Sequence, residues 1–336
     1  MRNSLNSSKD LLTILGPTAS GKTKLAVQIA HKLNGEIISA DSRQVYRGMD
    51  VGTGKDLGEY KQNAKSIPYH LIDIIDPLEE YNVAQFQKDF QRVSTDIRER
   101  DKLPILCGGT GFYIKAVLMD FQLPTAKPDK QLRQKLETWK LEDLIKELEA
   151  ISPGVSSRLP VDTKRRVIRA IEIAGARRRE AGDRNKKIRN PRLPSEIGRG
   201  GQAKSEIPAC HPKSDGASRQ NPLVLGVDFS REVIRERITR RLHERLKNGM
   251  IEEVESLLYN GVTHERLDSF GLEYRFISRY LQGHLTKEEM TTQLNTAIHQ
   301  FAKKQMTFFR NMEKNGIYIH WIPEGDFETA LGVISK

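Results

Sequence analysis

The chain has 336 residues, enough for one large domain that carries an insertion or for two domains with sizeable cores. The formal net charge is +11 and 37% of the residues are hydrophobic, but no apolar run approaches the ~20 residues of a membrane-spanning helix, so we expect no membrane association. The two cysteines, Cys107 and Cys210, are too few for a disulfide framework or a zinc site, and we expect a protein of the reducing cytoplasm.

The first third of the chain alternates apolar strands with helices. Apolar runs predict strands at residues 11–15 (LLTIL), 36–40 (EIISA), 70–76 (HLIDIID) and 103–107 (LPILC). Helical spacing of apolar residues predicts helices at 22–33 and about 83–100. This alternation is typical of a parallel sheet with helices on both faces, in which ligands bind beyond the carboxyl ends of the strands.

The rest of the chain is mainly helical. Residues 124–180 predict an insertion made of helices near 129–150 and 163–180, and the polar residues 181–221 predict a flexible excursion. Further elements are expected at 222–229 (strand), 231–260, 270–281 and 287–312 (helices) and 317–322 (strand). We therefore predict an α/β core formed by residues 1–123 and 222–336, with helices in its C-terminal part.

A phosphate-binding loop lies between the first predicted strand and the first helix. Its G-x-x-x-x-G-K-[ST] pattern is formed by Gly16, Pro17, Thr18, Ala19, Ser20, Gly21, Lys22 and Thr23. In such a loop the backbone N–H groups surround an anion, Lys22 reaches the terminal phosphate oxygens, and the Thr23 hydroxyl can hold Mg²⁺. The core is therefore predicted to have a P-loop NTPase-like fold, and the pattern would also permit ATP.

The acid that completes the magnesium site of a P-loop NTPase has no clear counterpart. Asp73 and Asp76 end the run at 70–76, but Pro77 follows them, and a structural or capping role is the alternative for both. The strand at 103–107 instead runs into a glycine-rich turn. This turn either lets a substrate approach the backbone or simply starts a helix.

Asp41 follows the second predicted strand, beside the phosphate-binding loop. A carboxylate near phosphates is electrostatically unfavourable unless magnesium or catalysis requires it, so Asp41 is a candidate general base. The alternative is a carboxylate that only caps a turn. Ser42, Arg43 and Gln44 offer donors for base edges or phosphates.

The positive charge is concentrated in a few segments. Lys and Arg cluster in KRRVIR (164–169), at 177–179, and again at Lys303, Lys304 and Arg310. This distribution favours a polyanionic partner, although a solvated basic helix face is the alternative for the first cluster.

Six blocks in this order together resemble the tRNA dimethylallyltransferase family, also called tRNA isopentenyltransferases, of the bacterial type. The blocks are GPTASGKT, ISADSRQVYRGMDVGTGK, YHLIDIIDP, QFQKDF, LPILCGGTGFYIKAV and AKKQMTFFRN, and the resemblance covers almost the whole chain except 181–221. It implies transfer of a dimethylallyl group from dimethylallyl diphosphate to N6 of the adenosine 3′-adjacent to the anticodon of tRNA. Mg²⁺ is the implied cofactor, and we expect a monomer.

The resemblance assigns roles around the leaving diphosphate. Lys22 and Thr23, with Mg²⁺, would stabilise its charge, Thr18 would orient it, and Asp41 would accept the proton of the attacking amine. In the segment RITRR, Arg241 would bind the diphosphate, and a solvated helical arginine is the alternative.

The resemblance also implies a channel into which the target base is extruded from the anticodon loop. The implied tRNA contacts are Asp41, Ser42, Arg43, Gln44, Thr110, Arg133, Arg165, Arg166 and Arg169. The four arginines of this set that lie in the insertion would contact tRNA phosphates, so the resemblance makes the insertion a helical tRNA-binding domain.

The chain departs from the family pattern in three places. Residues 271–275 (GLEYR) are two residues longer than the usual Gly-Tyr-Arg/Lys-Glu, His299 stands where arginine is common, and the excursion at 181–221 is long. The excursion would be a neutral insertion or a basic tether for RNA.

Two other functions are compatible with the loop. A P-loop kinase acting on a small metabolite would transfer phosphate from ATP and would not need a basic insertion. A non-catalytic RNA-binding module would tolerate the replacement of Asp41.

Overall fold

The computed structural model describes residues 10–62, 65–121, 123, 124, 126, 128–157, 159, 161–187 and 222–336. The described residues form two compact units, one of residues 10–120 and 222–336 and the other of residues 121–187. Of the predicted excursion, residues 181–187 continue a helix of the second unit, and 188–221 lie outside the described residues.

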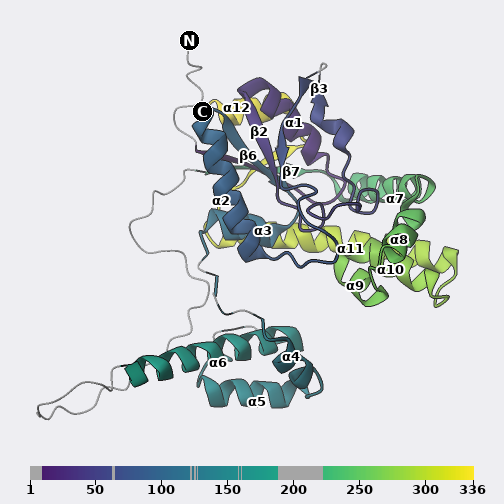
Figure 1. Cartoon of the computed structure of the whole chain (residues 1–336). Coiled ribbons are helices and arrows are strands. Elements are labelled where there is room, and N and C mark those ends of the chain that lie inside the picture. The colour runs from purple at the N-terminus through teal and green to yellow at the C-terminus, as the bar shows by residue number, and fades with distance from the viewer. Residues whose placement is uncertain are drawn as a thin grey trace, which may run out of the picture. The chain divides into compact units, whose positions relative to one another are not determined.

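The first unit is built on a six-stranded sheet in which every neighbouring pair of strands is parallel (Figure 1). Its strand order is β5-β2-β6-β1-β7-β8. The strands are β1 (Leu11–Leu15), β2 (Gly35–Ser39), β5 (Tyr69–His70), β6 (Leu103–Gly108), β7 (Pro222–Asp228) and β8 (His320–Pro323). A short hairpin, β3 (Lys61–Gln62) and β4 (Lys65–Ser66), stands apart from this sheet. The predicted P-loop NTPase-like parallel sheet is thereby confirmed.

The strand predicted at 70–76 is wrong for most of its length. Only Tyr69 and His70 pair with β2, at the edge of the sheet. The chain then turns, with positive φ at Leu71 (62°) and Asp73 (55°), which no strand accommodates. Leu71 and Ile72 are nevertheless buried, so their hydrophobicity reflects packing of a loop and not a strand.

Helices cover both faces of the sheet. Helices α1 (Lys22–Leu33) and α12 (Phe327–Ile334) pack on one face, and α2 (Val83–Glu99) and α3 (Gly111–Leu118) pack on the other (Figure 1). Because side chains alternate along a strand, Leu12 and Ile14 of β1 contact the first layer whereas Leu11 and Leu15 contact the second.

The C-terminal part of the first unit adds a group of helices with its own core. They are α7 (Arg231–Lys247), α8 (Met250–Tyr259), α9 (His264–Phe270), α10 (Leu272–Leu281) and α11 (Lys287–Lys314). The helix predicted at 231–260 is divided at Gly249, where φ is 91°. Gly271, with φ 135°, likewise separates α9 from α10, so the segment GLEYR begins at a helix junction.

The second unit is helical where it is described. Its helices are α4 (Lys130–Glu137), α5 (Leu141–Ile151) and α6 (Lys164–Lys187), and the single helix predicted at 129–150 is therefore two. Leu136, Leu144 and Ile171 lie in the apolar core that the three helices share. Within the described part of either unit, none of the helices combines the length and apolar content needed to cross a lipid bilayer.

Candidate functional site

The phosphate-binding loop joins β1 to α1, as its pattern predicts. Ala19 (φ 62°) and Gly21 (φ 74°) turn the chain so that Lys22 begins the helix. The Lys22 ammonium group donates to the carbonyl oxygen of Pro17 at 3.3 Å. Burial lowers the pKa of Lys22, and the nearby Asp41 carboxylate opposes that shift.

A cleft of about 780 Å³ lies beyond the carboxyl ends of β1, β2 and β6. These three strands are neighbours in the sheet, so the segments that follow them meet. Several predicted site residues line the cleft together: Thr18, Ala19, Gly21, Lys22, Thr23, Asp41, Ser42, Arg43, Gln44, Thr110 and Arg241. The same cleft therefore contains the phosphate-binding loop, the candidate base and the glycine-rich turn.

The turns after β2 and β6 are bonded to each other. The Thr110 N–H donates to the Ala40 carbonyl oxygen at 3.2 Å, and the Ser42 N–H donates to Thr110 Oγ1 at 3.1 Å. Gly108 is required here, because a Cβ at this position would lie 2.3 Å from the Ala40 oxygen. The glycine-rich turn thus both starts α3 and brings Thr110 against the segment that carries Asp41.

Asp41 both caps a turn and lines the cleft, so the two interpretations of this residue do not exclude each other. Its Oδ1 accepts from the Arg43 N–H at 2.9 Å, and no partner is recorded for Oδ2 among the described residues. Gln44 connects the same segment to two neighbours. Its Oε1 accepts from Ser39 Oγ at 3.0 Å and its Nε2 donates to the Gly54 carbonyl at 3.2 Å. Burial lowers the pKa of Arg43.

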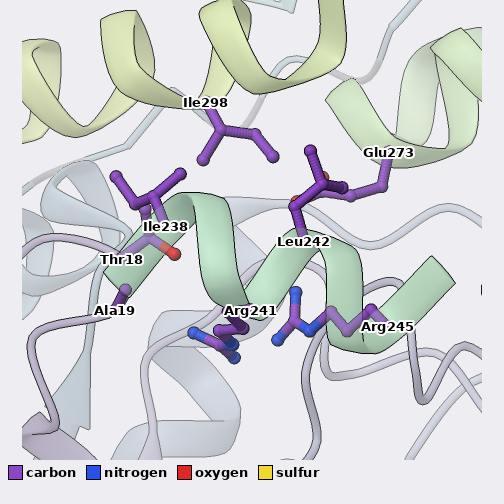
Figure 2. Close-up of a pocket in the computed structure, with 8 residues that line it drawn as sticks. All are labelled: Thr18, Ala19, Ile238, Arg241, Leu242, Arg245, Glu273 and Ile298. Carbon is purple, nitrogen blue, oxygen red and sulfur yellow. The ribbon is translucent and has the colours of Figure 1, made fainter. Parts of the chain in front are cut away.

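Arginines of α7 line the cleft together with residues of the phosphate-binding loop. Figure 2 shows Arg241 and Arg245 projecting from the same side of this helix, near Thr18 and Ala19. Arg241 Nη2 lies 3.5 Å from Asp56 Oδ2. The wall of this part of the cleft is completed by apolar side chains of α7 and α11 and by Glu273 from α10.

Sequence reasoning did not single out Gln305, although it lies inside the quoted block AKKQMTFFRN. Gln305 is buried on α11, where its Oε1 accepts from the Thr18 N–H at 2.9 Å and its Nε2 donates to the Gly109 carbonyl at 2.8 Å. It therefore ties the phosphate-binding loop to the turn after β6. The signal available in the sequence was a polar amide at a position that belongs to the apolar face of this helix. His299 of the same helix contacts α7, with its Nε2 3.3 Å from Thr239 Oγ1.

Asp73 and Asp76 have structural roles in the loop that follows β5, which agrees with the structural or capping interpretation and not with a magnesium site. Asp73 forms an ion pair with the buried Lys55, which also pairs with Asp50 at 2.9 Å. Asp76 Oδ1 accepts from the Leu78 N–H at 2.8 Å. Neither acid lines the cleft.

The remaining predicted tRNA contacts lie in the second unit. Arg133 and Arg169 both bind the buried carboxylate of Glu172, at 2.8 and 3.0 Å. Burial by itself would raise the pKa of Glu172, but the hydrogen bonds from these arginines and from the Asp129 N–H outweigh it and lower this pKa. Arg166 pairs with Asp162 at 2.7 Å, and Arg165 is exposed.

Known proteins resemble the chain along most of its length. A family model described as IPP transferase matches residues 44–312, and one described as isopentenyl transferase matches residues 9–69. The tRNA dimethylallyltransferase 1 of Parabacteroides distasonis is 47% identical over 315 residues, which cover 94% of this chain and 92% of that protein. The tRNA dimethylallyltransferase 1 of Geotalea uraniireducens is 44% identical over 317 residues, or 94% of this chain and 93% of that protein.

Solved structures agree with these relatives. The tRNA isopentenylpyrophosphate transferase of Bacillus halodurans superimposes with a TM-score of 0.63 and 32% identity, covering 98% of this chain and 95% of its own. A eukaryotic dimethylallyltransferase acting on tRNA has a TM-score of 0.69 at 24% identity, which supports the fold. None of these relatives is a kinase. The chain therefore belongs to the IPP transferase family, to which the resemblance of its six sequence blocks pointed.

Proposed function

We propose that the chain transfers a dimethylallyl group from dimethylallyl diphosphate to N6 of the adenosine 3′-adjacent to the anticodon in tRNA and releases diphosphate. One observation carries the proposal. A phosphate-binding loop and the carboxylate of Asp41 line a single cleft, at the ends of strands that belong to one sheet. Family membership supports dimethylallyl transfer to tRNA, because the relatives of Parabacteroides distasonis and Geotalea uraniireducens are named tRNA dimethylallyltransferase.

The donor's diphosphate would bind at the phosphate-binding loop. The backbone N–H groups of the loop, the amino end of α1 and the Lys22 ammonium group supply positive potential there. Thr18 would orient the diphosphate, and Arg241 would approach it from α7 on the other side of the cleft. These groups would stabilise the charge that develops on the leaving oxygen as the carbon–oxygen bond breaks.

Thr23 fits a magnesium site in which the phosphates of the substrate supply most of the ligands. Thr23 lines the cleft beside Lys22, in the first turn of α1. The described residues contain no cluster of three or more His, Cys, Asp or Glu side chains suited to a metal ion. Mg²⁺ often keeps several waters and binds through substrate phosphates, so Thr23 together with the diphosphate would suffice. When bound, the ion would neutralise charge on the diphosphate.

The acceptor base would enter from the side of the cleft that contains Asp41 and Thr110. An adenine stacked in an anticodon loop is out of reach, so it must leave the stack. As its N6 forms a bond with C1 of the dimethylallyl group, the bond from C1 to the diphosphate oxygen breaks and Asp41 takes the N6 proton. The second oxygen of Asp41, Oδ2, is available for that proton, because Oδ1 is already bonded to Arg43.

The rest of the tRNA would be held by donors around this site and by the helical insertion. Ser42, Arg43, Gln44 and Thr110 line the cleft where the base would enter. Arg133, Arg165, Arg166 and Arg169 would contact phosphates of the anticodon stem, and such contacts position an RNA without reading its sequence.

A transfer assay tests the proposal. The protein is incubated with unmodified tRNA, isotopically labelled dimethylallyl diphosphate and Mg²⁺, and the RNA is then digested and its nucleosides are identified. We expect label on N6 of the adenosine next to the anticodon, and none with a tRNA that has another base there. Absence of transfer to any tRNA from a folded, diphosphate-binding protein would contradict the proposal.

A further inference from the structure

Two arginines of α7 converge on one glycine in the cleft. Arg241 and Arg245 are one helical turn apart and project from the same side of α7 (Figure 2). Their guanidinium groups meet at Gly54. A Cβ at Gly54 would lie 2.0 Å from Arg241 Nη2 and 1.5 Å from Arg245 Nη2. Only a glycine leaves room for both groups, and its φ of +67° also suits glycine.

Arg245 is poorly satisfied by the protein. Among the described residues its buried Nη2 has no hydrogen-bond partner, and its Nη1 makes a long bond of 3.5 Å to the Gly52 carbonyl. Buried guanidinium N–H groups normally have partners, so an unpaired one indicates that a ligand supplies the partner.

The charges around Arg245 also favour an anion. Like charges at i and i+4 of a helix repel each other, and Arg241 and Arg245 have this spacing. Burial and the charge of Arg241 lower the pKa of Arg245 to about 10. Glu273 of α10 faces the pair, but no ion pair joins it to either arginine among the described residues, and burial raises the pKa of Glu273.

We propose that Arg245 is a second guanidinium ligand of the donor's diphosphate, beside Arg241. This inference rests on the proposed function. Arg245 lines the same cleft as Lys22 and Thr18 of the phosphate-binding loop. A phosphate oxygen between the two guanidinium groups would satisfy Arg245 Nη2 and offset the repulsion, because charged N–H donors bind phosphate strongly.

A purely structural role for Arg245 predicts something different. In that case the residue would only support the loop at Gly52 through its Nη1, and its loss would lower thermal stability without a selective effect on phosphate binding. The binding of inorganic pyrophosphate, the released product of the proposed reaction, separates the two roles.

The experiment measures pyrophosphate binding by calorimetry in the presence of Mg²⁺. The full-length protein is compared with Arg245→Met, Arg241→Met and the control Arg235→Met, which removes an exposed arginine of the same helix. Methionine keeps much of the apolar stem and removes the charge. We expect Arg245→Met and Arg241→Met each to weaken binding by about tenfold or more, and Arg235→Met to bind within about twofold of the parent.

Steady-state transfer supplies the second readout. We expect Arg245→Met to raise the KM for dimethylallyl diphosphate by a similar factor while the KM for tRNA stays within about twofold. Pyrophosphate affinity equal to that of the parent protein would overturn the role of Arg245. If Arg245→Met does not fold, Arg245→Gln makes the same test with a neutral polar group. A parent protein that binds pyrophosphate through Arg245 but never labels tRNA would refute the proposed function alone.

Discussion

Gln305 holds the backbone of Thr18 in place from a helix 287 positions away in the sequence. Its Oε1 accepts from the Thr18 N–H at 2.9 Å while its Nε2 donates to Gly109. One buried side chain thus fixes the distance between the phosphate-binding loop and the turn that precedes Thr110. In the proposed reaction this distance separates the donor from the acceptor.

We predict that Gln305→Leu lowers kcat/KM for transfer by roughly 10- to 100-fold, because a displacement of about 1 Å can cost that much. Leucine leaves the Thr18 N–H and the Gly109 carbonyl without partners, so we also expect a stability loss of about 1–3 kcal/mol. Gln305→Glu keeps an acceptor for Thr18 but cannot donate to Gly109, and its effect should be intermediate. Equal activity of Gln305→Leu and the parent in single-turnover assays would show that the bridge does not matter.

Replacing Asp41 tests the proton acceptor. Asp41→Asn keeps an oxygen that can accept from the Arg43 N–H, so the turn should survive. We predict that kcat falls by about 10²- to 10⁴-fold, the usual contribution of a general base, while binding of tRNA and pyrophosphate changes little. Filter binding and calorimetry check binding, and single-turnover assays check the rate. Near-normal rates would remove Asp41 from the mechanism.

The sequence predicted the strands and helices beside the phosphate-binding loop well, but it predicted the edge of the sheet poorly. The central strand β1 is buried on both faces, so its five residues form the continuous apolar run that was predicted. The run at 70–76 is also rich in Leu and Ile, but only its first residue, His70, pairs in the sheet, and the backbone at 73–75 bonds to the loop at Gln44 and Val45. Composition alone does not distinguish these two kinds of burial.

Chain position predicted the part of the site that follows strands, whereas on α7 only Arg241 was expected, and that expectation came from the family resemblance. The phosphate-binding loop follows β1 and Asp41 follows β2, and the carboxyl ends of these two strands lie at the same edge of the parallel sheet on either side of β6, so chain position alone predicted that the loop and Asp41 would meet. Gln305 and Arg245 come from helices that carry many polar residues. Gln305 stands on the apolar face of α11, but the groups that this face meets depend on tertiary packing, and the periodicity of α7 gave no signal for Arg245.

We predict that Gly54→Ala disrupts donor binding. A methyl group there would collide with the guanidinium groups of Arg241 and Arg245, in addition to about 1 kcal/mol of backbone strain at positive φ. Gly48→Ala is the matched control, because its φ is +70° and nothing lies within 4 Å of its added Cβ. The KM for dimethylallyl diphosphate should rise at least tenfold in Gly54→Ala only. Equal effects of the two substitutions on this KM would assign the loss to backbone strain.

Arg165 should contribute a simple electrostatic contact to tRNA. It is exposed and forms no ion pair with any other residue that the structure describes, whereas Arg133 and Arg169 already hold Glu172. We predict that Arg165→Ala weakens tRNA binding and lowers the slope of log K against log salt by about 1. Arg165→Lys should keep most of the slope because it keeps the charge. The measurement is filter binding over a range of KCl concentrations, and an unchanged slope in Arg165→Ala would exclude the contact.

A buried carboxylate at the end of the sheet opposite the cleft should control how the stability of the fold changes at low pH. Glu36 lies near the start of β2, and its oxygens accept from Lys102 at 2.7 Å, from His70 at 2.7 Å and from two nitrogens of Arg100. Burial by itself would raise the pKa of Glu36, but these hydrogen bonds outweigh it and lower the pKa from 4.5 to about 2. The folded state therefore binds this proton more weakly than the unfolded state does.

The pH dependence of stability follows from that difference. The ionised carboxylate contributes roughly 3 kcal/mol to the free energy of unfolding. This contribution is fully present above about pH 4.5 and is lost as the pH falls toward 2. Glu36→Gln should therefore unfold at lower denaturant concentration at pH 7, and the difference from the parent protein should shrink below pH 4.5. Since the ion-pair cluster lies at the opposite end of the strands from the cleft, the KM values should not change. A stability difference that stays constant from pH 7 to pH 3 would mean that the charge of Glu36 is not what stabilises this cluster.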